Sequence, residues 1–139
     1  MNRQELIRAA FAARKFAYAP YSNFKVGAAL LAKNGTIYTG CNIECATFSP
    51  TNCAERTALF KAVSEGVRTF EAIAIVGGKA DGTDDGSIAS PCGVCRQMLY
   101  EFAGDDLVVL MAKSETNFVE KTLGELLPFA FGKGESYKK

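Results

Sequence analysis

Apolar residues recur at helical intervals in the first and middle parts of the chain. The first such stretch opens at Asn2, which stands three residues before Glu5 in the spacing of a capping box, and it ends before Pro20. The second begins at Cys53, and Gly66 is placed to terminate it. We therefore expect one helix at the start of the chain and a second helix after Cys53.

A third helical stripe follows a segment rich in glycine and aspartate. Residues 77–90 have a composition that favours turns over periodic structure, so we expect a long loop there. After it, Ser90 is the expected N-cap and Pro91 the expected first-turn residue of the third helix.

Short apolar segments predict the strands. Two of them flank Asn34 and Gly35, the dipeptide that best accepts the positive φ angles of a type I′ hairpin turn. The strands are expected at residues 24–32, 36–41, 72–76, 107–111 and 117–120, with a short helix and an aromatic tail after the last strand.

The order of these elements predicts the fold class. A strand, a helix and a strand between residues 72 and 111 imply a parallel crossover, so the sheet is mixed and helices cover it. We predict an α/β fold: a three-layer α/β/α sandwich with a mixed five-stranded sheet, in a single domain over residues 1–139.

Composition narrows the classes of function. A net charge of +1 gives no general attraction for phosphate backbones, which argues against a nucleic-acid partner. The sequence contains no run of about eighteen apolar residues and no signal-peptide core, which argues against a membrane partner. We expect a cytoplasmic protein, and in a reducing cytosol its five cysteines are expected to be metal ligands, catalytic groups or buried apolar residues.

The absence of histidine excludes much of the usual catalytic chemistry. Catalytic triads and imidazole general bases need a ring that titrates near neutral pH, and the chain has none. A bound metal ion removes this difficulty, because Zn²⁺ lowers the pKa of its water from about 15.7 to roughly 7.

The cysteines offer ligands for such an ion. Cys92 and Cys95 have the two-residue gap that lets two sulfurs share a metal, and Cys53 supplies a third sulfur from another helix start. Three protein ligands leave a fourth position for water, which is typical of catalytic zinc. Two alternatives remain on spacing alone: a structural site with a fourth sulfur from Cys41 or Cys45, and a thioredoxin-like redox pair.

Glu55 favours the catalytic interpretation. It lies two residues after Cys53 on the first helical turn, where a carboxylate can approach a metal-bound water without being a ligand. The segments "CAE" and "PCGVC" follow the pattern of zinc deaminases, with cysteine in the place of histidine.

Five ordered motifs carry a resemblance to a known family. They are "PYSNFKVGAAL", "GCNIE", "CAERTA", "SPCGVCRQ" and "ELLP", and they extend over nearly the whole chain. The sequence resembles the small, homotetrameric, three-cysteine zinc cytidine deaminases. The resemblance implies a zinc-dependent hydrolase that converts cytidine and deoxycytidine to uridine and deoxyuridine in pyrimidine salvage, with a nucleoside and water as its partners.

The resemblance also implies roles for individual residues. Zn²⁺ would be bound by Cys53, Cys92 and Cys95, and Glu55 would carry the protons. Arg56 would offset the charge of the three thiolates. The implied substrate-binding residues are Phe24 beside the pyrimidine, Asn42 and Glu44 at the ribose, and the Ala54 backbone N–H at the pyrimidine O2. The resemblance further implies a homotetramer with shared active sites, in which Phe131 reaches into the site of a neighbouring subunit.

Each of these substrate and charge assignments has a plainer alternative. Phe24 suits an ordinary core position, Asn42 a turn, Glu44 a solvated surface and Arg56 a surface arginine. The sequence also departs from the family at Cys45, where asparagine is common, at Phe48, where tyrosine is usual, and in a longer glycine and aspartate loop.

Three other functions remain open. One is deamination of another nucleoside-like compound, such as a cytosine-bearing antibiotic, although Asn42 and Glu44 favour a ribose. Another is deamination of a nucleic acid or nucleotide, which would require a basic track or a phosphate pocket, whereas the lysines and arginines here are scattered. The third is a non-enzymatic zinc module, which would have no use for Glu55.

Overall fold

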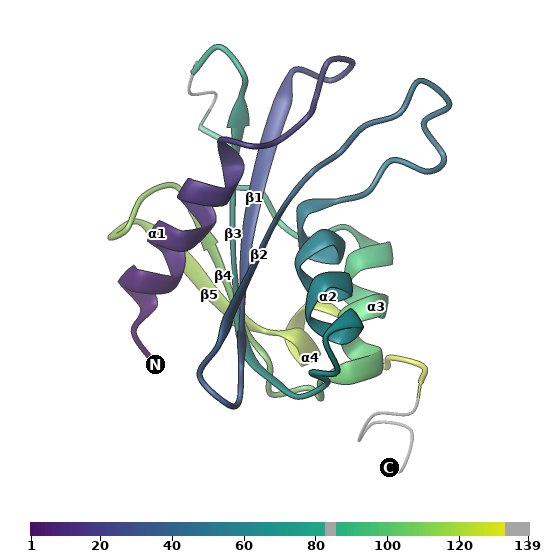
Figure 1. The fold of residues 1–139 in the computed structure, drawn as a ribbon. Helices are drawn as coiled ribbons and strands as arrows, with labels where there is room; N and C mark the ends of the chain where they lie inside the picture. The colour runs from purple at the N-terminus through teal and green to yellow at the C-terminus, as the bar shows by residue number, and fades with distance from the viewer. Residues whose placement is uncertain (83–85, 133–139) are drawn as a thin grey trace.

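The computed structural model describes residues 1–82 and 86–132. The helices and strands follow one another in the order predicted from the sequence (Figure 1). They are α1 (Arg3–Arg14), β1 (Phe24–Ala32), β2 (Ile37–Cys41), α2 (Ala54–Ser64), β3 (Phe70–Lys79), α3 (Gly93–Phe102), β4 (Val108–Ala112), β5 (Phe118–Thr122) and α4 (Leu123–Leu126).

The five strands form one mixed sheet in the order β2-β1-β3-β4-β5. β3 and β4 are parallel because α3 crosses between them, and the other neighbours are antiparallel. Figure 1 shows α1 on one face of the sheet and α2, α3 and α4 on the other. The predicted α/β fold, with helices on both faces of a mixed five-stranded sheet, is therefore confirmed.

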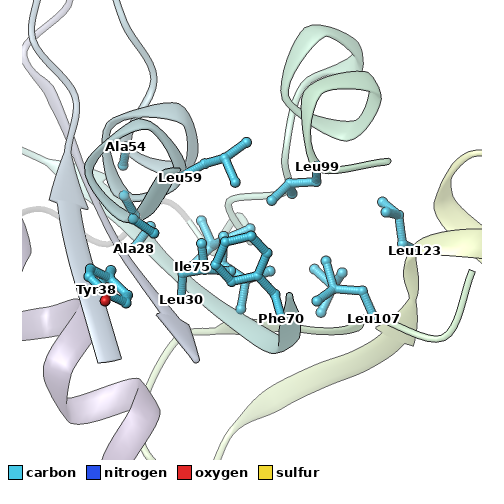
Figure 2. Close-up of a cluster of buried hydrophobic side chains, with 14 of the residues drawn as sticks. Ala28, Leu30, Tyr38, Ala54, Leu59, Phe70, Ile75, Leu99, Leu107 and Leu123 are labelled. Atoms are coloured by element: carbon cyan, nitrogen blue, oxygen red, sulfur yellow. The ribbon is translucent and has the colours of Figure 1, made fainter. Parts of the chain in front are cut away.

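The core is divided by the sheet into two clusters of buried side chains. Successive residues of a strand point to opposite faces, so Leu30 and Ile75 join the cluster under α2 and α3, while Ala29 and Ala74 join the cluster under α1. Figure 2 shows the first of these clusters, in which Leu59 and Leu99 descend from the helices onto the sheet. Strands buried on both faces read as continuous apolar runs, which explains the sequence of the central strands.

Glycines let the two longest helices lie close to the sheet. A Cβ atom at Gly27 would come within 2.1 Å of the Ala10 carbonyl oxygen of α1. A Cβ atom at Gly40 would come within 2.4 Å of the Ala58 backbone nitrogen of α2. The close seat of α2 on β2 fixes the position of the first turn of α2, where Cys53 and the residues after it lie.

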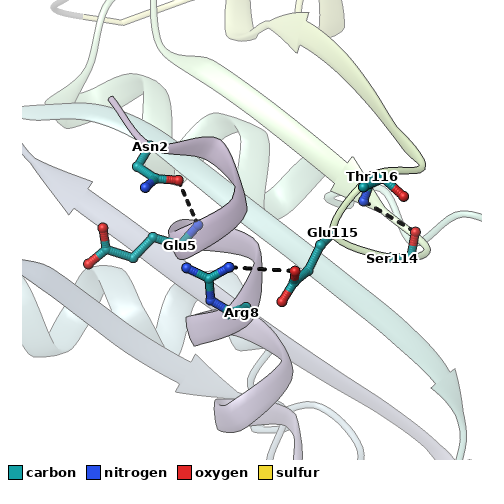
Figure 3. Close-up of polar contacts among 6 residues, drawn as sticks. All are labelled: Asn2, Glu5, Arg8, Ser114, Glu115 and Thr116. Carbon is teal, nitrogen blue, oxygen red and sulfur yellow. Dashed lines mark hydrogen bonds and ion pairs between the residues drawn. The ribbon is translucent and has the colours of Figure 1, made fainter.

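Polar contacts are made by the N-terminus and the middle of α1. The Asn2 side chain caps the helix by accepting a hydrogen bond from the Glu5 backbone N–H at 3.0 Å, as predicted, and Arg8 pairs with Glu115 at 3.5 Å beside the turn at Ser114 (Figure 3). Exposed ion pairs of this kind contribute at most about 1 kcal/mol. The position of α1 therefore depends on its buried face.

The hairpin between β1 and β2 differs from the predicted type I′ turn. Gly35 has a φ of +92°, but Asn34 does not adopt a positive φ. The Ala32 carbonyl accepts from the Gly35 N–H at 3.0 Å, and the Ala32 N–H donates to the Thr36 carbonyl at 2.9 Å. The loop therefore has three residues, one more than a type I′ turn. A three-residue loop needs only one residue with a positive φ, and Gly35 supplies it.

The start of α3 also differs from the prediction. Cys92, not Ser90, is the N-cap, and its Sγ accepts from the Cys95 backbone N–H at 3.5 Å. Pro91 therefore precedes the helix. The expected loop over residues 77–90 is shorter than predicted because Gly77 and Gly78 belong to β3, and residues 83–85 of that loop lie outside the described residues.

None of the helices found in residues 1–82 and 86–132 has the length and apolar character needed to cross a bilayer.

Candidate active site

The N-termini of α2 and α3 bring three cysteines together. Cys53 is the N-cap of α2, Cys92 is the N-cap of α3, and Cys95 lies in the first turn of α3. Their sulfur atoms all lie within 4.8 Å of one another, and those of Cys53 and Cys92 are 3.8 Å apart. Within the described residues, Cys41 and Cys45 are not part of this cluster, so the structure does not favour a four-sulfur site.

The cluster fits a zinc ion. Zinc binds thiolate sulfur at about 2.3 Å in a tetrahedral arrangement, which places two bound sulfurs about 3.8 Å apart. The separation between Cys53 and Cys92 has this value. Three sulfurs also leave one tetrahedral position for another ligand, as in catalytic zinc sites.

The surroundings of Cys53 favour its thiolate. The pKa of Cys53 is lowered to about 5, because the thiol of Cys95 donates a hydrogen bond to it and Arg56 contributes a further donor and a positive charge. The Nη2 atom of Arg56 lies 3.3 Å from the Cys53 sulfur. The pKa of Cys95 is raised in turn, because Cys95 supplies that proton and lies beside the Cys53 charge. A bound cation would replace the shared proton and stabilise all three thiolates.

Glu55 interacts with Cys53 and Cys95 and is almost fully buried, with 4% of its surface exposed. Burial raises its pKa to about 7, and the neighbouring charge of Cys53 contributes to the same shift. A carboxyl group with such a pKa both gives and takes a proton near neutral pH, which suits a general acid and base.

A pocket of about 280 Å³ opens beside Glu55. This volume is close to the lower end of the range for small-molecule sites, about 300 Å³. The pocket is lined by Phe24, Val26, Asn42, Glu44, Thr51, Asn52, Cys53, Ala54, Glu55, Ala89, Ser90 and Cys92. It thus contains the predicted site residues apart from Cys95, Arg56 and Phe131.

Asn42 lines the pocket, and its side chain is hydrogen-bonded to the backbone of β1. Its side-chain oxygen accepts from the Val26 backbone N–H at 2.9 Å, and its side-chain nitrogen donates to the Phe24 carbonyl at 2.8 Å. Asn42 therefore fixes the first residues of β1 and does more than stabilise a turn. An amide has two donor hydrogens and two acceptor lone pairs, so one N–H and one lone pair remain for a ligand.

Glu44 is anchored, in contrast to the alternative of a solvated charge. One carboxylate oxygen accepts from the backbone N–H groups of Tyr21 and Ser22 at 3.0 and 3.1 Å, and the other accepts from the Ser22 hydroxyl. The Ser22 hydroxyl is the main reason that the pKa of Glu44 is lowered. The carboxylate therefore stays ionised and oriented at the pocket edge.

The remaining predicted residues lie as follows. Ala54 is the first residue of α2 and is fully buried, and a backbone N–H at this position has no partner within the helix. Arg56 contacts the Cys53 sulfur, and its buried Nε has no hydrogen-bond partner among the residues that the structure describes. Phe131 is 77% exposed and outside the pocket lining, with its carbonyl held by the Gln97 side chain at 2.7 Å.

Several contributing residues were not identified from the sequence. Ser22 orients Glu44, and the only signal for it was its place in the "PYSNF" segment. Asn52 lines the pocket and donates to the Thr57 hydroxyl at 3.1 Å, which in turn donates to the Cys41 carbonyl at 2.9 Å. This contact ties the first turn of α2 to the end of β2.

Residues 1–111 match the model of the cytidine and deoxycytidylate deaminase zinc-binding region. The chain belongs to this deaminase family. The predicted family and the zinc cofactor are thereby confirmed, since the three cysteines lie in the zinc-binding region and form a cluster able to hold the ion.

Individual relatives of this deaminase cover most of its length. A cytidine deaminase of Sporosarcina psychrophila is 50% identical over 133 residues, which are 96% of this chain and 93% of that protein. The crystal structure of a cytidine deaminase from Burkholderia pseudomallei superposes with a TM-score of 0.85 at 46% identity, covering 94% of this chain and 100% of the other. A blasticidin-S deaminase of Bacillus cereus is 35% identical over 108 residues, 76% of each protein.

We predict one zinc ion per chain, bound by Cys53, Cys92 and Cys95. Replacement of any of the three by serine should abolish zinc binding, because a hydroxyl is a much poorer zinc ligand than a thiolate. Cys41→Ser and Cys45→Ser serve as matched controls and should keep their zinc. Metal analysis of the purified variants measures this, and loss of zinc from Cys41→Ser would indicate a structural four-sulfur site.

Proposed function

We propose that this deaminase hydrolyses cytidine and deoxycytidine to uridine and deoxyuridine, as a step of pyrimidine salvage. The observation that carries the proposal is a nearly fully buried Glu55 directly beside a three-sulfur cluster, in a pocket of nucleoside scale. The names of the relatives support the choice of a cytosine nucleoside.

The chain supplies binding groups and proton transfer. When bound by the three cysteines, Zn²⁺ would supply a nucleophilic water for C4 of the pyrimidine by lowering the pKa of that water. Glu55 takes one proton from the water and gives it to the ring N3. It then takes the second proton from the new hydroxyl on C4, which becomes the carbonyl, and delivers this proton to the amine that leaves as ammonia. Burial of the Glu55 carboxyl favours its protonated form, which supports its proposed role as a proton donor as well as an acceptor.

The pocket residues orient the substrate in this proposal. Phe24 lies beside the pyrimidine, and the Ala54 backbone N–H donates to its O2. Asn42 and Glu44 bind the ribose hydroxyls, using the amide groups that β1 leaves unused and a carboxylate that Ser22 holds in place. Because these groups are already fixed by other contacts, the substrate is oriented without ordering them at each turnover.

Blasticidin S is a second candidate substrate, because a relative with that name matches the chain. Loss of absorbance in the ultraviolet separates the candidates when cytidine, deoxycytidine, CMP, adenosine and blasticidin S are compared side by side. Turnover of cytidine and deoxycytidine supports the proposal. If the protein deaminates blasticidin S but not cytidine, the proposed substrate class is rejected.

Replacement of Glu55 by glutamine tests its role. We expect Glu55→Gln to keep its zinc and its fold but to lose deamination by about 10² to 10⁴, the range for removal of a general acid and base. Turnover, zinc content and thermal unfolding are measured on the same sample. Near-normal turnover in a zinc-loaded variant would remove Glu55 from the mechanism.

Arg56 is proposed to withdraw charge from the sulfurs. Three thiolates with Zn²⁺ carry a formal charge of −1, which weakens the metal as a Lewis acid. We expect Arg56→Gln to lower turnover by at least about tenfold with zinc still bound, since a hydrogen bond to a charged group is worth roughly 1.5 to 3 kcal/mol. Arg56→Lys should restore only part of the turnover, because an ammonium lacks the planar fork. A zinc-loaded Arg56→Gln protein with unchanged kinetics would contradict this role.

We further propose a homotetramer in which Phe131 completes the site of a neighbouring subunit. Phe131 is exposed and absent from the pocket of its own chain, while its backbone is held by α3 through Gln97. Phe48 is also exposed, and its ring meets that of Tyr21 edge to face at 5.9 Å beside Glu44. The exposure of both rings supports a role for them in contacts between subunits.

Complementation between two defective subunits tests this assembly. Glu55→Gln subunits keep Phe131, and Phe131→Ala subunits keep Glu55. If Phe131 acts across an interface, refolding the two together should give more activity than the sum of the separate proteins. Activity equal to that sum, or a monomer in sedimentation with full turnover, would reject shared sites.

We also propose that residues 1–139 act as one domain and that the protein is cytoplasmic. All strands of the described residues join one sheet, which supports a single domain. All five cysteines are free thiols, which suits a reducing compartment.

A further inference from the structure

The row of core side chains along β3 ends with a glycine at the pocket. Ile73 and Ile75 point toward α2 and α3 and belong to the larger core cluster. Alternation along a strand places Gly77 on the same face, one step closer to the pocket. The series of two isoleucines therefore ends in a residue without a side chain.

Two pocket residues occupy the space in front of Gly77. A Cβ atom there would lie 2.7 Å from the Ala89 Cβ, and 2.9 and 3.2 Å from Cε1 and Cζ of Phe24. Both neighbours line the pocket. The strand register pairs Val26 with Gly77, so Phe24 is the diagonal neighbour whose ring leans across the glycine.

From this contact we propose that Gly77 is a positioning residue for Phe24: the missing side chain sets how far the Phe24 ring sits back from the pocket. The inference rests on the proposed function, in which the Phe24 ring lies beside the pyrimidine. A methyl group at position 77 would fill the space that the ring now uses. The ring would then move toward the substrate.

The surrounding structure decides which atoms give way. Pairing of Val26 with Gly77 and of Lys25 with Gly78 holds the β3 backbone against β1. Phe24 is only half-buried, so its ring has room to turn, whereas the paired backbone does not. Overpacking of this kind moves side chains before it moves a sheet.

Gly78 provides a matched control on the opposite face of the same strand. A Cβ atom there would meet Nη2 of Arg14 at 2.8 Å, which is the far end of a long side chain. This side chain lies away from the pocket lining. Gly78→Ala therefore makes the same chemical change in the same strand without touching Phe24.

Steady-state kinetics with cytidine tests the proposal. We expect Gly77→Ala to raise KM about tenfold with kcat within about twofold of the wild type and with normal zinc content, since the change weakens binding of the pyrimidine without touching Glu55. Gly78→Ala should keep the wild-type KM and kcat. An unchanged KM for Gly77→Ala overturns the proposal, whereas failure of the wild type to deaminate cytidine overturns the proposed function instead.

A double-mutant cycle asks whether Gly77 acts through Phe24. In a Phe24→Ala background, Gly77→Ala should change KM little, because no ring remains to be displaced. The same cycle read by urea unfolding needs no turnover, and Gly77→Ala should destabilise the protein less when Phe24 is absent. Additive effects in both readouts overturn the proposal. If Gly77→Ala does not fold, the double variant Gly77→Ala, Ala89→Gly is used. It removes the contact between the new methyl group and the Ala89 Cβ but keeps the contact with the Phe24 ring. An unchanged KM in this double variant overturns the proposal in the same way.

Discussion

The site depends on two helices that begin at the same end of one sheet. The sulfurs of Cys53 and Cys92 are 3.8 Å apart although they come from different helices, so an error of one residue in either helix start would separate them. The parallel pairing of β3 with β4 and the close seat of α2 on β2 at Gly40 fix these two starts. The spacing that the metal ligands require thus constrains residues in the sheet, such as Gly40, that are not ligands themselves.

The same arrangement supports the proposal that a chain without histidine performs acid and base chemistry. The first turn of α2 holds the sulfur of Cys53, the buried carboxyl of Glu55 and the guanidinium of Arg56 within four residues. Burial raises the pKa of Glu55 to about 7, close to that of an imidazole. In the proposed mechanism, one helical turn therefore supplies a metal ligand, an acid and base, and a positive charge beside the sulfurs.

Local patterns in the sequence were sufficient for the order of elements and for the sulfur cluster, because periodicity and ligand spacing are local properties. Errors occurred where distant residues decided the structure. Ser90 had the stronger capping signal, yet Cys92 caps α3, and Gly77 lies in a strand because β1 pairs with it. The exposed position of Phe131 and the anchoring of Glu44 by Ser22 depend on tertiary contacts that no spacing rule describes.

The sulfur cluster also has a thermodynamic consequence for the whole chain. Cys53 and Cys92 are 39 residues apart, so a shared ion closes a long loop that includes β3. An ion that binds only the folded chain stabilises it by RT ln(1 + [L]/Kd), where [L] is the free concentration of the ion, or about 2.7 kcal/mol at a hundred times Kd. The stability of this fold therefore depends partly on the concentration of free zinc around it. In a newly made chain, zinc can stabilise the fold only after the segment containing Cys95 has folded.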